Sequence, residues 1–264
     1  DEDQLPAFTW RVRKNPAKCA VINYITHHDG FTLMDLVSYE ERHNEANGEG
    51  GQDGPAYNFS WNCGVEGPSR KKKIQELRLQ QMKNAFLLLL FSQGTPMILA
   101  GDEFGNSQQG NNNPYCQDNE TSWLEWNRLK KQAELFEFVK AAIAFRKTHP
   151  LLHQAKELQG TSGSVLGYPD VSCHGQQAWY GNFETTSRHF GMMYCGEEGE
   201  YLYVAYNLHW KEQSFALPKL PEGLSWQLVF DTEDGASPEK EIKWIDQKSF
   251  EAPPRSILVL EGRK

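Results

Sequence analysis

The sequence predicts an α/β segment over residues 1–150, followed by an all-β domain over residues 151–264. Two observations support the α/β part: two apolar runs have β-like composition, and each is followed by a stretch with apolar residues at helical spacing. Beyond residue 151, short apolar runs alternate with turn residues, which is typical of an antiparallel domain. The apolar runs are 19–26 and 95–100, and the helical stretches are 74–91 and 135–148.

The remaining segments of the first part are mostly polar. Residues 1–18, which contain Pro6 and Pro16, predict a loop leading into the first strand. A short helix is expected at 31–39. The segments 40–69 and 104–120 are rich in Gly, Asn and Gln and predict long loops, and loops of this length inside a compact domain are usually functional.

The second part predicts a small antiparallel β-sandwich. Its strands are separated by turn sequences such as Pro221-Glu222-Gly223 and Glu233-Asp234-Gly235. The expected strands are 178–180, 201–207, 213–217, 226–230, 242–244 and 256–260.

Composition excludes several functional classes. The net charge is −8 and no basic stripe is present, so we expect neither a nucleic-acid partner nor a membrane partner. No apolar stretch reaches the ~18 residues of a transmembrane helix. The five cysteines are widely spread and lack CxxC spacing, which favours a reducing, cytoplasmic location. We predict no metal and no cofactor.

Titratable side chains follow both predicted strands of the α/β part. His27-His28-Asp29-Gly30 ends the first strand and Gly101-Asp102-Glu103 ends the second. The carboxyl ends of parallel strands meet at one edge of a sheet, so these side chains predict a binding or catalytic site there. A metal site, a structural cluster and simple capping by the acidic residues are the alternatives. No G-x-S-x-G, Walker or GxGxxG motif is present.

The first strand with its tip resembles the seventh-strand signature of the α-amylase superfamily, glycoside hydrolase family thirteen. Within that superfamily, the resemblance is to the isoamylase and glycogen-debranching branch, and it is densest over residues 19–150. The segments that carry it, in order, are 21–33, 43–49, 60–68, 93–97, 101–105, 110–113 and 115–119.

The resemblance implies the last two β/α units of a TIM (β/α)8 barrel, followed by a C-terminal antiparallel β-sandwich domain. It implies that Asp29 stabilises the transition state and that His28 binds a hydroxyl of the same sugar. His27 departs from the small residue expected there, and we expect it to support its neighbours. Trp61 and Trp123 are candidate stacking platforms. The further substrate-binding residues implied are Asn47, Asp102, Glu103, Asn112, Tyr115 and Asp118.

A retaining glycosidase needs a nucleophile and a proton donor about 5–5.5 Å apart. In this superfamily both come from earlier barrel strands, and their signatures do not occur in these 264 residues. The resemblance therefore implies the C-terminal part of an isoamylase-type α-1,6-glucosidase acting on glycogen, amylopectin or limit dextrins. We expect the chain alone to be inactive and its partner to be the N-terminal half of the barrel. The alternatives are a non-catalytic glucan-binding or structural module, half of a two-chain glycosidase, and a pullulanase or another activity of the superfamily.

Overall fold

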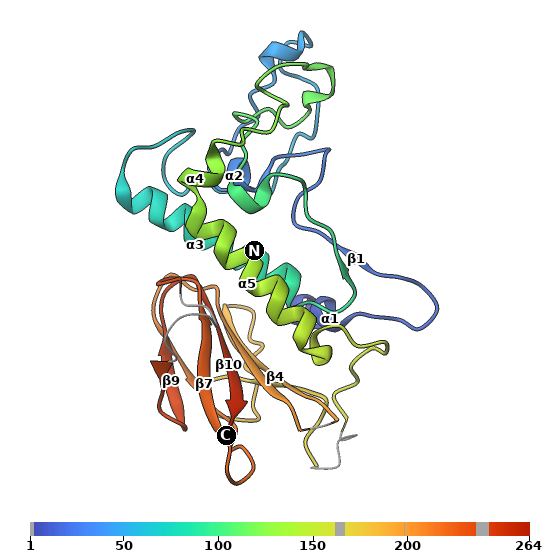
Figure 1. The fold of residues 1–264 in the computed structure, drawn as a ribbon, viewed down its shortest axis with the longest axis vertical. Coiled ribbons are helices and arrows are strands. Elements are labelled where there is room, and N and C mark those ends of the chain that lie inside the picture. Colours follow the sequence, from blue (N-terminus) through green and yellow to red (C-terminus); the bar gives the residue numbers. More distant parts are fainter. Residues whose placement is uncertain (1–2, 162–166, 198, 236–242) are drawn as a thin grey trace. The chain divides into compact units, whose positions relative to one another are not determined.

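A computed structural model describes residues 3–161, 167–197, 199–235 and 243–264 (Figure 1), and the described residues form two compact units. The first unit draws on Asp1–Ile22, Leu90–Thr95 and Ala141–Lys264, and the second on Asn23–Leu89 and Pro96–Lys140. This division differs from a single boundary near residue 150, because three segments that precede residue 151 belong with the β domain.

The two predicted strands of the α/β part are present but short. Strand β1 spans Ile22–Asn23 and β2 spans Thr95–Pro96. The Thr95 N–H donates to the Val21 carbonyl (2.8 Å) and the Met97 N–H to the Asn23 carbonyl (2.8 Å). Because the two residue numbers rise together, the strands pair in the parallel sense. The pairing stops there because Leu99–Asp102 forms a turn, closed by a bond from the Asp102 N–H to the Leu99 carbonyl (3.1 Å).

Both long helices predicted by the spacing are confirmed: α3 spans Lys72–Leu90 and α5 spans Ala133–Thr148. Helix α2 (Leu33–Leu36) is capped at its N-terminus by Thr32, whose hydroxyl accepts a hydrogen bond from the Asp35 N–H (3.2 Å). None of the helices within the described ranges is long and apolar enough to cross a membrane. The shorter helices are α4 (Arg128–Lys131), η1 (Glu45–Asn47), η2 (Asp102–Phe104), η3 (Pro114–Cys116) and η4 (Pro150–Leu152).

The C-terminal part is an antiparallel β domain, as predicted. A six-stranded sheet has the order β3-β4-β5-β10-β7-β8, and β6 pairs with β9 in a second, two-stranded sheet. The strands are β3 (Val171–His174), β4 (His189–Cys195), β5 (Tyr201–Asn207), β6 (Gln213–Ala216), β7 (Ser225–Asp231), β8 (Lys243–Trp244), β9 (Ser249–Ala252) and β10 (Ser256–Arg263).

Both faces of the large sheet are covered, so β5 is buried along its whole length. On one face Tyr203 packs in a core with Phe215 and Phe250 of the small sheet. On the other face, Phe8 packs edge-on against Tyr206 (5.1 Å between ring centroids) and Phe145 against Phe230 (5.4 Å). This second layer explains why segments from early in the chain belong to the first unit, which contains the β domain and is called the β unit.

Residues 1–18 are not only a loop: Leu5–Arg13 forms helix α1. Pro6 lies in the first turn, where an α-helix does not need the missing N–H, so this proline is compatible with the helix. Leu5 and Val12 lie two turns apart and are both buried, which supplies the apolar face.

One strand prediction is wrong, and three strands of the structure were not predicted. Residues 178–180 form a turn with an isolated bridge between Gln177 and Tyr180 instead of a strand. Strands β3, β4 and β9 were not predicted; β4 is almost entirely buried and β9 is four residues long, so neither gives a clear alternating pattern. Of the predicted strand 242–244, Ile242 lies outside the described residues.

Candidate functional site

The residues of the first strand tip, His28 and Asp29, follow β1 and have exposed side chains. The Asp29 backbone N–H donates a hydrogen bond to Nδ1 of His27 (3.1 Å). The His27 ring contacts the ring of Tyr24 edge-on (5.0 Å between centroids) and that of His28 in the same way (5.6 Å). His27 therefore supports the tip, while the Asp29 carboxylate and the His28 imidazole remain open to solvent.

The second strand tip is different, because Asp102 is only 2% exposed. One carboxyl oxygen accepts a hydrogen bond from the Thr26 hydroxyl, and the other accepts one from the Leu33 N–H at 2.8 Å. Burial raises the pKa of Asp102 to about 7 although both hydrogen bonds act to lower it. The carboxyl group thus joins the segment after β2 to the segment after β1, and it faces protein rather than solvent.

The turn that carries Asp102 depends on a glycine. Gly101 has φ of 99°, and a Cβ at this position would lie 2.7 Å from Cβ of Asn106. Glu103 accepts a hydrogen bond from the Gly101 N–H (2.9 Å), so it stabilises the same turn and is only partly exposed.

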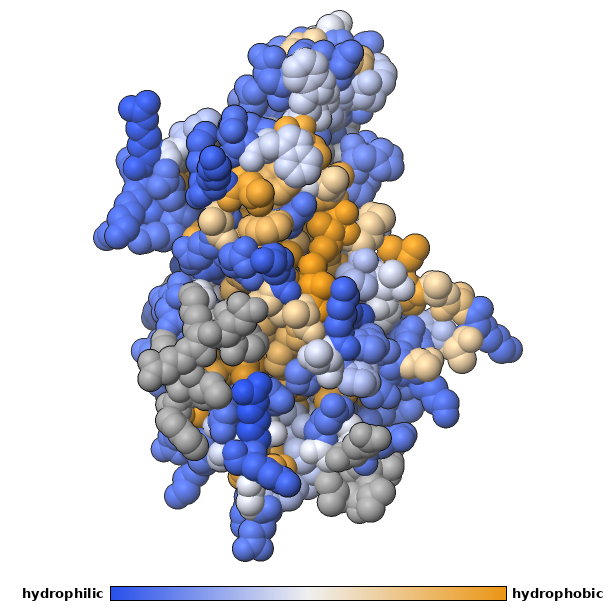
Figure 2. Space-filling view, viewed as in Figure 1, coloured by the Kyte–Doolittle hydropathy of each residue, from blue (hydrophilic) through white to orange (hydrophobic). Residues whose placement is uncertain are grey.

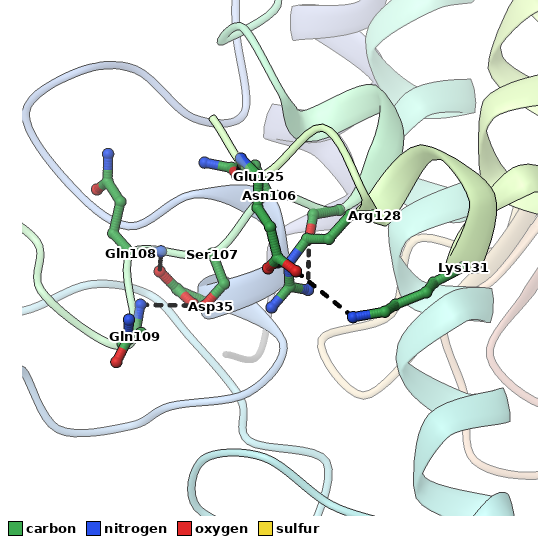
Figure 3. A network of polar contacts seen from close by, with 9 residues as sticks. Asp35, Asn106, Ser107, Gln108, Gln109, Glu125, Arg128 and Lys131 are labelled. Carbon is green, nitrogen blue, oxygen red and sulfur yellow. Dashed lines mark hydrogen bonds and ion pairs between the residues drawn. The ribbon is translucent and has the colours of Figure 1, made fainter. Parts of the chain in front are cut away.

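Helix α2 is joined to the loop 104–120 by Asp35, which is fully buried (Figure 3). Its carboxylate accepts hydrogen bonds from the Ser107 hydroxyl (2.5 Å) and the Gln108 N–H (2.7 Å). Burial raises the pKa of Asp35, while the bond from Ser107 opposes the shift. This contact fixes the start of the loop relative to α2.

The loops 40–69 and 104–120 are held together by asparagine side chains. Asn112 is fully buried, accepts a hydrogen bond from Nδ2 of Asn44 (2.8 Å), and donates to Oδ1 of Asn58 (2.7 Å). Asn47 accepts from Nδ2 of Asn111 (2.8 Å) and donates to the Asp53 carboxylate (2.8 Å). Hydrogen bonds lower the pKa of Asp53, and the one from Asn47 has the largest effect. Asn47 and Asn112 therefore shape the loops by internal hydrogen bonds.

A groove of about 740 Å³ lies among these loops. Trp123 in its wall is 58% exposed, and the indole N–H donates to the Asp118 carboxylate (3.1 Å). Arg128 donates to Glu125 (2.8 Å) and to the Gly105 carbonyl (2.9 Å), which holds the guanidinium on the groove wall (Figure 3). The groove thus combines an exposed aromatic ring with side chains that donate and accept hydrogen bonds.

The far wall of the groove contains Glu66, whose carboxylate lies 3.5 Å from Nε2 of His43. Burial acts to raise the pKa of Glu66, but hydrogen bonds from the Glu40 N–H, from Asn62 and from the Glu41 N–H lower it overall. This carboxylate is therefore ionised near neutral pH and can accept hydrogen bonds from a ligand.

The predicted site residues fall into two groups. Asp29, His28, Tyr115 and Asp118 have exposed side chains, and Tyr115 is 76% exposed. Asn47, Asn112 and Asp102 are turned inward, as described above, and Glu103 stabilises a turn. None of the eight predicted residues lines the groove directly. Asp118 contributes indirectly, because its carboxylate accepts a hydrogen bond from Trp123 in the groove wall.

Sequence reasoning missed the polar residues of the groove. Tyr39, Glu66 and Arg128 come from three separate segments, and each has a common structural interpretation when considered alone. The signal that pointed to the region was the length and the Asn and Gln content of the two loops, together with Trp123.

The comparisons with known proteins agree with this fold. Residues 172–241 match the family described as "Isoamylase 1-3, C-terminal". The pullulanase from Bacillus acidopullulyticus superposes with a TM-score of 0.66 at 17% identity, covering 99% of this chain and 27% of that one. The pullulanase from Anoxybacillus sp. LM18-11, complexed with maltotetraose, gives a TM-score of 0.63 at 17% identity, over 97% and 30% of the two chains. The fold is therefore one found in pullulanases.

Relatives in sequence indicate the family more specifically than the pullulanase fold does. The chain is 38% identical over 261 residues to a glycogen operon protein GlgX homolog of Mycobacterium tuberculosis, covering 91% of this chain and 36% of that protein. It is 52% identical over 146 residues to a glycogen debranching enzyme of Pectobacterium carotovorum subsp. carotovorum, covering 55% and 22%. The chain belongs to the isoamylase-type branch that includes these two relatives, and it corresponds to a C-terminal portion of them. It spans 22–36% of the length of these two relatives.

Proposed function

We propose that the chain is the C-terminal part of a retaining α-1,6-glucosidase that debranches glycogen, amylopectin or their limit dextrins. Support comes from a relative named as a glycogen debranching enzyme, from a relative named as a glycogen operon protein, and from the strand tip. The observation that carries the proposal is the arrangement at that tip. Asp29 and His28 are exposed beyond a strand that pairs in the parallel sense. His27 accepts a hydrogen bond from the Asp29 N–H and so fixes the backbone that carries the solvent-facing carboxylate.

In this proposal the Asp29 carboxylate accepts hydrogen bonds from hydroxyls of the sugar at the scissile bond. These bonds strengthen as positive charge develops on the ring in the oxocarbenium-like transition state. His28 contacts the same sugar. The nucleophile and the acid/base belong to the part of the barrel that precedes this chain in the relatives.

The loops supply the glucan-binding surface of the proposed enzyme. The apolar face of a glucose ring stacks on Trp123 or Tyr115, and the carboxylate of Glu66 and the amide of Gln109 bind hydroxyl groups. Asn47 and Asn112 hold the two loops together, and Asp102 fixes the strand ends, so these three are positioning residues. We assign Glu103 and Asp118, which were predicted to bind substrate, to the same supporting role, because Glu103 stabilises the turn at Gly101 and Asp118 accepts a hydrogen bond from Trp123.

The proposed barrel also requires a partner for the strands. Ile22, Tyr24, Ile25 and Met97 are 60%, 51%, 38% and 39% exposed, although parallel strands are usually buried on both faces. Apolar side chains gather where Figure 1 labels β1 (Figure 2). This surface favours association with the N-terminal part of a (β/α)8 barrel, in the same polypeptide or in a second one. In this proposal the seventh and eighth strands of the barrel are Ile22–Asn23 and Thr95–Pro96.

The test is a full-length chimera in which this chain replaces the matching segment of the Mycobacterium tuberculosis relative. Asp29→Asn should lower kcat for glycogen by about 10²- to 10³-fold, the loss seen when one transition-state hydrogen bond is removed. Asp246→Asn, an exposed carboxylate of the β unit, is the matched control and should leave kcat unchanged. A chimera that is active and insensitive to Asp29→Asn would exclude this role and favour a non-catalytic module.

A further inference from the structure

The connection between β3 and β4 carries an unusual group of exposed aromatic side chains. Trp179, Tyr180 and Phe183 are 48%, 67% and 37% exposed. The segment Gly175–Phe183 contains no charged residue, but it contains the amides of Gln176, Gln177 and Asn182. The surface is therefore neutral, partly apolar, and rich in groups that both donate and accept hydrogen bonds.

Trp179 is held in an unfavourable backbone conformation. Its φ is 68°, in the left-handed region that bulky residues rarely adopt. Such conformations persist where the surroundings enforce them, and they cluster at functional sites. Here the Trp179 N–H donates a hydrogen bond to Nδ1 of His174 (2.7 Å).

His174 is suited to this task because it is fully buried and neutral. Burial lowers the pKa of His174 to about 4, so the imidazole carries one proton near neutral pH. Nδ1 accepts from Trp179, which places the proton on Nε2, and Nε2 then donates to the Ser172 hydroxyl (2.8 Å). The buried histidine therefore links β3 to the backbone that presents the indole.

The indole ring is also positioned by packing. It stacks on Tyr168 (5.6 Å between centroids, 27° between planes) and meets His174 edge-on (5.0 Å). Tyr168 is itself fixed, because its hydroxyl donates to the Lys219 carbonyl (2.9 Å). The ring is thus held on one side while nearly half of its surface stays exposed, so a ligand that stacks on it finds a surface already in place.

We propose that Trp179, with the amides beside it, binds a neutral α-glucan chain on the β unit. A glucose ring has an apolar face that stacks on an indole and a rim of hydroxyls that suits glutamine and asparagine amides. The lack of charge in the segment disfavours nucleic acids and anionic ligands. The identification of the ligand as an α-glucan rests on the function proposed above. The evidence for an aromatic binding surface does not depend on that function.

The test is affinity electrophoresis of the whole chain in gels with and without soluble glycogen. Trp179→Gly and Trp179→Asn both remove the ring and both tolerate a positive φ, so each should fold, as circular dichroism and thermal melting will verify. Loss of one stacking contact should weaken retardation by between about two- and tenfold. Trp179→Phe keeps an aromatic surface and should retain most of the retardation.

Trp210→Ala is the matched control, because Trp210 is 52% exposed on the same β unit and should not affect retardation. Wild-type chain that is not retarded, or Trp179→Gly and Trp179→Asn variants retarded like wild type, would overturn the proposal. The two proposals fail separately. Retardation that depends on Trp179 supports this surface even if Asp29→Asn leaves the chimera active.

Discussion

Asp29 and Asp102 show how two strand-end carboxylates acquire different tasks. Asp29 is exposed and has its backbone N–H bound by His27, whereas Asp102 is buried and accepts hydrogen bonds from Thr26 and Leu33. An exposed carboxylate can bind a ligand. A buried carboxylate whose two oxygens are occupied serves to join segments, and it resists ionisation because it has lost its hydration.

The burial of Asp102 predicts a particular pH dependence. Since the folded-state pKa of about 7 lies above the unfolded value of 3.8, the folded chain binds the extra proton between these two values, and the contribution of Asp102 to stability is greatest below about pH 4. This contribution is lost as the pH rises through 7. Asp102→Asn keeps the neutral form, so its melting temperature should exceed that of wild type at pH 8 and match it at pH 4.

The control for this experiment is Thr26→Val, which removes one hydrogen bond but keeps the titrating carboxyl group. Its melting temperature should still fall relative to that of Asp102→Asn between pH 4 and pH 8. Parallel melting curves of wild type and Asp102→Asn across this range would show that Asp102 does not titrate as described.

At the residue scale, the sequence could predict which side chains lie near the strand ends but not which of them face solvent. Asp102 is buried by contacts with residues 69 and 76 positions away in the chain. Asn112 is likewise occupied by Asn44, 68 positions away. Contacts at such separations leave no local pattern, so a buried asparagine and a sugar-binding asparagine look the same in the sequence.

At the scale of elements, prediction succeeded where periodicity was strong. Helices α3 and α5 follow a long 3.6-residue pattern, and β5 matches its predicted bounds at both ends. Helix α1 was missed because Pro6 was interpreted as a loop residue, although the first turn tolerates it. Strand β4 was missed because both of its faces are covered, so its apolar run does not alternate.

One polar contact between α3 and α5 gives a prediction at this scale. Lys83 of α3 is 1% exposed, and its ammonium lies 2.6 Å from the Glu134 carboxylate of α5. Glu134→Gln would leave a buried charge without its counter-ion and should lower the free energy of unfolding by about 1–3 kcal/mol. Glu137→Gln, which breaks an exposed pair with Lys140, should cost less than about 0.5 kcal/mol. Equal urea-denaturation midpoints for the two variants would contradict this account.

At the scale of the whole chain, the β domain was predictable as a class but its extent was not. The sequence pattern changes near residue 150, yet the sheet needs apolar cover on its second face, and Phe8 and Phe145 provide it from earlier segments. The parallel strand pair was predicted as two full strands and is present as two residues in each. Local composition does not report which other segments complete a core or a sheet.

The sequence of the whole chain also leads to a prediction about catalytic activity. The 264 residues contain Asp29 but no Arg-x-Asp-Ala motif for a nucleophile, and a retaining mechanism requires a nucleophile and an acid about 5–5.5 Å apart. The chain alone should therefore release no reducing sugar from glycogen, although it binds glycogen through Trp179 as proposed. The chimera described above, assayed identically, is the positive control. Hydrolysis that rises in proportion to the concentration of the isolated chain would contradict the assignment of catalysis to residues outside it.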